Sequence, residues 1–148
     1  MKKTLLIVLF ISLGFSQQII PQITETYDNG NVKNITYHEK SRTGIEKVKY
    51  EKYYKYGQKE SEETYKNGKL DGLWTEWHAN GQKRWEGTYK DGKRDGKWTY
   101  WRDNGQKEEE GTYKNGEVNG KWIRWWDNGK KACEGIKRQN KKGVYYNG

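Results

Sequence analysis

The chain has 148 residues and a formal net charge of +9, from 29 Lys and Arg against 20 Asp and Glu. Residues 17–148 contain only 13 Ile, Leu and Val, so the apolar surface is carried by 8 Trp and 12 Tyr, and a thick aliphatic core is excluded. The single cysteine, Cys133, excludes an intramolecular disulfide.

Residues 1–16 have the pattern of a secretory signal peptide, with a basic start at Lys2-Lys3, an apolar run over 5–11 and small residues at Gly14 and Ser16. The apolar run is about a dozen residues long, whereas a membrane-spanning helix needs roughly 20. No later segment is apolar enough to span a bilayer. We therefore expect a cleaved leader and an exported protein in the periplasm, at the cell surface or secreted.

Removal of the leader lowers the net charge to +7, which still suits an anionic partner. Nucleic acid is the usual partner of so basic a chain, but export separates the protein from it, so no nucleic acid is expected. The partners that remain are a protein, a glycan or an anionic envelope surface.

A period of 24 residues organises the rest of the chain. Residues 67–90, 91–114 and 115–138 align without gaps, and the first two agree at 16 of 24 positions. Fixed self-similarity of this length indicates a repeat architecture. The pattern predicts a degenerate N-terminal repeat at 17–42, four repeats over 43–138 and a partial C-terminal repeat at 139–148.

Each repeat has the turn signals of a β-hairpin. Asn-Gly or Asp-Gly dipeptides occur at 67–68 and 80–81 and recur one period later, and they favour the I′ turn, which needs positive φ at both central residues. The runs between them are rich in Trp, Thr and Tyr. We therefore predict an all-β protein, an elongated antiparallel sheet of tandem 24-residue hairpins with strands of roughly 6–8 residues.

The predicted sheet places aromatic rings on both faces. Trp74 and Trp77 are three residues apart, so they point to opposite sides of a regular strand. Equivalent residues of successive repeats lie two strands apart, about 9.5 Å. Glycines in the intervening strands, at 87, 111 and 135, should let the rings of one Trp row lie over the backbone.

The pattern Asn/Asp-Gly-Lys-x-x-Gly-x-Trp-x-x-Trp-x-x-Asn-Gly-Gln-Lys, shown by residues 91–107, resembles the bacterial variant of the MORN repeat. The resemblance implies stacked hairpins, a role in protein scaffolding or near membranes, and no shared active site. Some relatives are labelled antitoxins, although an exported chain does not suit a cytoplasmic antitoxin. The repeat 43–66 has Tyr50 and Tyr53 in place of the Trp pair, which confines a Trp surface to the C-terminal half.

Groups that could perform catalysis are few. The only histidines are His38 and His78, and we expect His78 to be an exposed loop residue and Cys133 a partly buried small one. Glutamates recur at 62, 86, 110 and 134, too far apart for a retaining glycosidase pair, and we expect each to pair with Lys on an adjacent strand. We predict no enzyme, no cofactor and no metal site.

The aromatic rows and the basic residues beside them form the candidate binding surface. Lys83, Lys107 and Lys131 flank this surface. Its predicted members are Trp74, Trp77, Trp98, Trp101, Trp122, Trp125, Trp126, Arg102 and Arg124. The leading hypothesis is an exported protein-interaction or scaffold module. The alternatives are a cell-wall or glycan-binding module and an antitoxin-like partner that neutralises a toxin.

Overall fold

A computed structural model describes residues 18–42, 44–140 and 143–147. These residues form a single antiparallel sheet and contain no helix, which confirms the all-β prediction. The predicted signal peptide, residues 1–16, lies outside the described residues.

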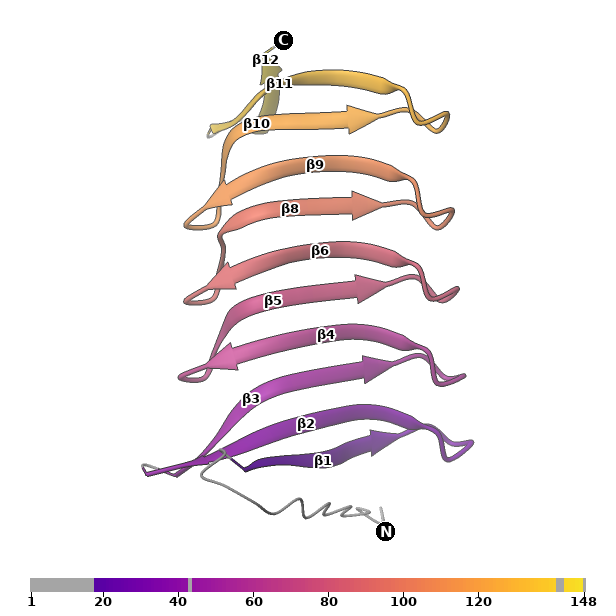
Figure 1. Ribbon diagram of the computed structural model, residues 1–148, viewed down its shortest axis with the longest axis vertical. Coiled ribbons are helices and arrows are strands. Elements are labelled where there is room, and N and C mark those ends of the chain that lie inside the picture. The colour runs from indigo at the N-terminus through magenta and orange to yellow at the C-terminus, as the bar shows by residue number, and fades with distance from the viewer. Residues whose placement is uncertain (1–17, 43, 141–142, 148) are drawn as a thin grey trace.

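Figure 1 shows the sheet as an elongated ladder in which strands follow one another in chain order, from β1 at one end to β12 at the other. The two-residue strand β7 pairs only with β6. The strands are β1 (Ile19–Thr26), β2 (Val32–Ser41), β3 (Gly44–Tyr53), β4 (Lys59–Lys66), β5 (Lys69–Trp77), β6 (Lys83–Lys90), β7 (Lys93–Arg94), β8 (Gly96–Trp101), β9 (Lys107–Lys114), β10 (Glu117–Trp125), β11 (Lys131–Asn140) and β12 (Gly143–Asn147). Several are longer than the 6–8 residues expected.

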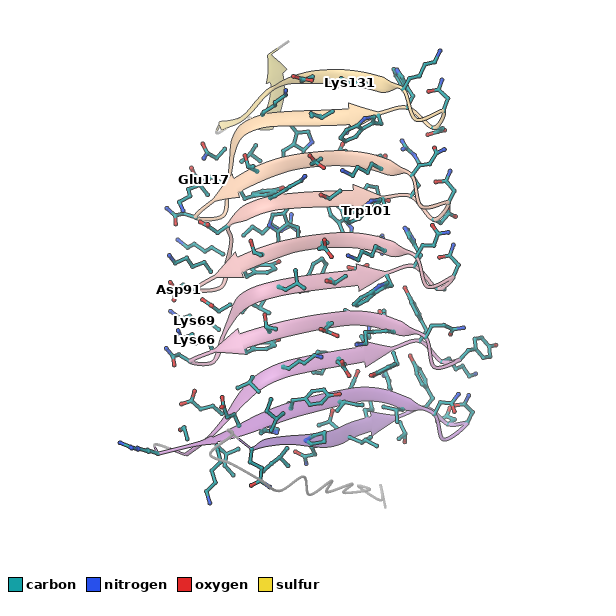
Figure 2. The ribbon with its side chains drawn as sticks, in the orientation of Figure 1. Lys66, Lys69, Asp91, Trp101, Glu117 and Lys131 are labelled. Carbon is teal, nitrogen blue, oxygen red and sulfur yellow. The ribbon has the colours of Figure 1, made fainter. Side chains whose placement is uncertain are left out.

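The turns that join one repeat to the next are the predicted I′ turns. Asn67 and Gly68 have φ of 50° and 74°, and the dipeptides at 91–92 and 115–116 repeat this pair of positive values. Positive φ at both central residues matches the right-handed twist of the flanking strands. These turns lie on one side of the ladder, where Figure 2 labels Lys66, Lys69, Asp91 and Glu117.

The loops within the repeats differ from the predicted I′ turn. In the loop at 78–82, Gly81 alone has positive φ, the Gly81 amide donates to the His78 carbonyl, and the His78 amide donates to the Gln82 carbonyl. This is a three-residue loop with a left-handed glycine and an adjoining bulge, consistent with the register shift between Glu76 and Trp77. The Asn80 side chain accepts from the Gln82 amide at 3.0 Å, which a regular I′ turn does not require.

The strand register gives the sheet two chemically different faces. One, the packed face, carries Trp74, Trp98 and Trp122; the other, the charged face, carries Glu62, Glu86, Glu110 and Glu134. Trp77 lies on the charged face, since Lys59, which binds Glu62 there, also lies over the Trp77 ring, and this confirms that Trp74 and Trp77 point to opposite sides. Among the described residues, no second layer covers either face.

The packed face contains a row of rings in which Trp and Tyr alternate from strand to strand: Trp74, Tyr89, Trp98, Tyr113 and Trp122. Neighbouring rings meet edge to face with centroids 5.2 to 6.4 Å apart, a geometry that stabilises by about 1 kcal/mol beyond burial. Trp98 and Trp122 are the buried hydrophobic residues among those described. The core is therefore one ring thick.

Glycines make the burial of these rings possible. Trp98 lies against Gly87 and Trp122 against Gly111, so closely that a Cβ on either glycine would overlap the indole. The covering of strand glycines by Trp rings is confirmed at both positions. Trp74 instead pairs with Glu63 and is only half-buried, because the earlier repeat has a glutamate where the later ones have glycine.

Candidate functional site

The charged face presents a regular lattice of lysine and glutamate. Lys107 lies 2.7 Å and Lys97 2.9 Å from the two carboxylate oxygens of Glu110. Glu134 is bridged in the same way by Lys131 and Lys121, and Glu62 by Lys59 and Lys49. One lysine of each pair precedes its glutamate by three residues, and the other lies on the preceding strand, which confirms the expected cross-strand pairing at these three positions. At Glu86 the expectation is wrong, because the paired lysine, Lys83, lies on the same strand.

These ion pairs shift the titration of the carboxylates. Hydrogen bonds from Lys121 and Lys131 hold the pKa of Glu134 below its ordinary value. Burial alone would raise the pKa of Glu110, but the hydrogen bonds and charges of Lys107 and Lys97 outweigh it, so this pKa is also lowered. Glu110 and Glu134 are thus charged at neutral pH, and each is flanked by two ammonium groups, so these positions carry an excess of positive charge.

Tryptophans lie beside the lattice at the loop side of the same face. Lys59, Lys83 and Lys107 each place an ammonium 5.7 to 5.9 Å from the ring centroid of Trp77, Trp101 and Trp125 respectively. Each lysine therefore contacts both a carboxylate and the face of a ring. All three rings are half-buried, and Figure 2 labels Trp101 and Lys131 toward this side of the sheet.

A buried carboxylate anchors the N-terminal part of the charged face. Glu51 is 4% exposed; it accepts hydrogen bonds from the Tyr37 and Tyr53 hydroxyls, both at 2.6 Å, and its other oxygen is 2.7 Å from Lys59. Burial by itself would raise the pKa of Glu51, but these hydrogen bonds together hold it well below 4.5. Burial and the bond to Glu51 raise the pKa of each tyrosine.

The loops are tied together by side chains that occupy one position of the repeat. The hydroxyls of Tyr27 and Tyr54 donate to the carbonyls of Tyr53 and Trp77, at 2.7 and 2.8 Å. The His78 ring is 2.9 Å from the Trp101 carbonyl. Arg102 donates to the Trp125 carbonyl at 3.1 Å. We refer to these four bonds as the loop ladder.

The loop ladder corrects one expectation for the histidine. His78 was expected to be an exposed loop residue, but it is half-buried with a ring nitrogen on the Trp101 carbonyl. The equivalent residues in the neighbouring repeats are Tyr54 and Arg102, which also donate to a carbonyl of the next repeat. Cys133 was expected to be partly buried, but it is exposed, because its strand neighbour Arg124 turns toward Glu109 instead of covering it.

The structure divides the predicted binding residues among several environments. Trp98 and Trp122 are buried in the packed face, and Trp74 is half-buried beside them. Trp77, Trp101 and Trp125 line the charged face. Trp126 is 61% exposed in the loop at 126–130, and the Arg102 guanidinium reaches from the preceding loop to within 2.9 Å of Asp127. Arg124 is exposed on the packed face.

An aromatic pair outside the predicted set also lies on the packed face. The ring centroids of Trp85 and Tyr100 are 4.4 Å apart, and Arg94 lies 4.2 Å from the Trp98 ring centroid and 5.9 Å from that of Trp85. The positions of Trp85 and Tyr100 vary between repeats, so a search for repeated residues passes over them. Their alternation with Trp74 and Trp98 along the strands could have placed them on this face.

The described residues contain no group of three or more His, Cys, Asp or Glu placed to hold a metal ion. The hollows on the sheet are shallow. One of about 490 Å³ lies between successive turns, around Lys66, Asp71, Lys90 and Asp95, and one of about 310 Å³ lies on the charged face around Leu73 and Trp101. Within the same part of the chain, no helix has the length and apolarity to cross a membrane.

The family model described as MORN repeat variant matches residues 70–91 and 94–115. Two successive hairpins of the chain are therefore similar to this repeat. Each match covers one hairpin and ends at the next I′ turn, so the MORN unit and the structural repeat coincide. No curated protein matches the chain, and no solved structure does. MORN repeats are commonly protein- or membrane-interaction modules and are generally non-catalytic.

Proposed function

We propose that this chain is an exported, non-catalytic scaffold that binds a protein through the charged face. The observation that carries the proposal is an open sheet whose charged face repeats the same Lys and Glu from β4 to β11, beside Trp77, Trp101 and Trp125. Such a face offers one chemical unit several times in register. Repeat arrays use extended surfaces of this kind for binding.

The difference between the two faces supports the choice of the charged face. On the packed face, the Trp98 and Trp122 rings are buried against neighbouring side chains and expose little surface to a partner. On the charged face, Trp77, Trp101 and Trp125 remain half-exposed beside lysine side chains. Aromatic rings are enriched at protein interfaces, whose rims are polar.

Site-specific photocrosslinking tests the proposal. A crosslinking residue replaces Lys121, on the charged face, or Cys133, on the packed face of the adjacent strand; both positions are exposed. We expect a discrete crosslinked protein from Lys121 and none from Cys133, in the cell-envelope fraction. Mass spectrometry of the same fraction should find chains lacking residues 1–16. Equal crosslinking from both faces, or an intact leader in the cytoplasm, would contradict the proposal.

The glycan-binding alternative is favoured by Trp126, which is 61% exposed at the last loop. An exposed indole is a platform for a sugar ring. A polysaccharide pull-down should compare wild type with Trp126→Ala. Trp98→Ala is not a suitable variant for this assay, because Trp98 is buried and its loss would unfold the sheet. Unchanged retention of Trp126→Ala would remove the alternative.

A further inference from the structure

The lysine–glutamate lattice has one incomplete position. Three of the repeated glutamates, Glu62, Glu110 and Glu134, are each bridged by two lysines. Among the described residues, Glu86 is contacted by one basic side chain, that of Lys83, through Oε2. Glu86 lacks the cross-strand lysine that its three counterparts have, and its Oε1 oxygen is the one that Lys97 and Lys121 contact at Glu110 and Glu134.

The missing lysine is replaced by Leu73. Leu73 stands 24 residues after Lys49 and 24 before Lys97. Leu73 also has the same register as Lys97. Leu73 pairs with Thr88, and Lys97 pairs with Thr112, the equivalent of Thr88 in the next repeat. The backbone therefore aims residue 73 at Glu86, but the leucine side chain ends short and remains 48% exposed.

A hollow of about 310 Å³ lies beside Leu73 on the charged face, and its counterpart one repeat later, where Lys97 is present, is about 150 Å³. Leu73 and Trp101 form its apolar walls, Thr88 and Thr99 line it between them, and Glu86 lies at the position where an ammonium would bind. The wall composition fits an apolar stem, and the carboxylate fits a cationic end.

Two lysines that also line the hollow are already committed elsewhere. Lys97 and Lys107 place their ammonium groups 2.9 and 2.7 Å from Glu110. One repeat later, Lys97 itself occupies the equivalent slot beside Lys107. The lattice therefore holds two ammonium groups close together where both contact the same glutamate.

We propose that the hollow over Glu86, bounded by Leu73 and Trp101, receives a lysine side chain of a partner protein. This inference rests on the proposed function and names the chemistry that the partner presents. The stem of the incoming lysine packs on Leu73 and Trp101, and its ammonium binds Glu86 Oε1. Lysine is favoured over arginine because the cross-strand residue is a lysine at each of the three complete positions: Lys49, Lys97 and Lys121.

Nuclear magnetic resonance of the purified chain tests the inference with two small probes. N-acetyl-lysine methylamide carries the stem and the ammonium, whereas N-acetyl-norleucine methylamide carries an apolar stem alone. We expect the lysine probe to produce saturable shifts at the Trp101 indole and at the amides of Thr88 and Thr99, with a dissociation constant in the millimolar range. The norleucine probe should shift them at least threefold less at equal concentration.

Two substitutions locate the binding. Leu73→Lys supplies the missing side chain from within and should abolish the lysine-probe shifts while the protein unfolds at the wild-type temperature or above. Glu86→Gln should weaken the probe at least threefold, in line with the modest strength of exposed ion pairs. Undiminished shifts in Leu73→Lys, or their absence in the wild type, would overturn the inference.

The outcome is separable from that of the proposed function. If crosslinking from Lys121 captures a partner but the lysine probe does not bind, the scaffold role survives and the lysine slot fails. If the probe binds but no partner is crosslinked, the slot stands and the scaffold role fails. A captured partner should bind Leu73→Lys at least threefold more weakly than the wild type.

Discussion

At the residue scale, the stability of this protein depends on a small number of positions where packing is close. Trp98 is 1% exposed although the sheet has a single layer. Gly87 has no side chain, so the indole can lie directly against the backbone there, and the Arg94 guanidinium lies over the ring. Tyr89 and Tyr113 contact the indole edge to face. The indole nitrogen also donates to the Thr88 carbonyl at 3.1 Å.

Gly87→Ala adds a single methyl group but should lower the free energy of unfolding substantially. The new methyl group would overlap the Trp98 ring, and overpacking of this kind costs about 1 to 3 kcal/mol. Urea unfolding followed by Trp fluorescence measures the loss. Lys90→Ala, an exposed change on the same strand, is the control and should stay within about 0.5 kcal/mol of wild type. A neutral Gly87→Ala would show that the ring does not rest on this strand.

Glu51 makes stability depend on pH in a predictable direction. Its pKa in the folded protein lies below the ordinary value of 4.5. The stabilisation is complete above that pH and is lost as the pH falls toward the folded pKa. Glu51→Gln should cost about 2 kcal/mol at pH 7, in the range for hydrogen bonds to a charged group. The difference from wild type should shrink below pH 4.5 in chemical denaturation.

Glu46→Gln on the same strand is the control, since Glu46 lies outside the Tyr37–Tyr53–Lys59 cluster. Its stability difference from wild type should stay small at every pH. A Glu51→Gln deficit that persisted unchanged at pH 3 would contradict the assignment, because the charge would then not be its source.

At the element scale, each hairpin is held to the next by more than strand pairing. The loop ladder retains its geometry while the donor changes from Tyr to His to Arg. Each donor reaches the carbonyl of the last residue of a strand in the next hairpin, namely Tyr53, Trp77, Trp101 or Trp125. On the other side of the sheet, the Asp71 carboxylate accepts from the Asp91 amide, and Asp95 accepts from the Asn115 amide one repeat later.

Removal of one rung should have a measurable but limited effect. Tyr54→Phe deletes the hydroxyl that donates to the Trp77 carbonyl at 2.8 Å. A hydrogen bond of this kind contributes about 1 kcal/mol to the free energy of unfolding. Tyr56→Phe in the same loop is the matched control, because Tyr56 is 81% exposed. Equal effects of the two variants in thermal unfolding would disprove the contribution of the ladder.

At the scale of the whole molecule, the sheet is a linear array in which each hairpin contacts its neighbours alone. Stability in such arrays is approximately a sum over repeats and the interfaces between them. The length of the molecule is therefore adjustable in steps of one repeat, provided that the alternation of strand direction is kept.

Deletion of residues 91–114 should leave a folded, shorter protein. The cut removes β7, β8 and β9, joins Lys90 to the I′ dipeptide Asn115-Gly116 and brings Trp122 over Gly87. Small-angle scattering should show a molecule shorter by about 9.5 Å, two strand spacings, with cooperative unfolding. Deletion of 103–114 is the control: it joins two strands that run in the same direction, which a short turn cannot connect. The C-terminal half should then fail to fold.

The sequence by itself determined the architecture, because a 24-residue period with paired turn signals admits few arrangements other than stacked hairpins. It also placed Trp74 and Trp77 on opposite faces and assigned glycines as platforms, since strand alternation and residue size decide both. The tertiary structure decided how the rings are used. Burial of Trp98 depends on its neighbours in three strands, and no local pattern reveals them.

The same limit explains the loops and the candidate site. The dipeptide Asn80-Gly81 is compatible with two hairpin loops, and the choice follows from the bulge that the Trp77 pairing imposes. The environment of His78 depends on a carbonyl 23 residues away. The incomplete position at Glu86 becomes visible only when register brings Leu73 beside it, because an ion-pair lattice is a property of adjacent strands and not of one segment.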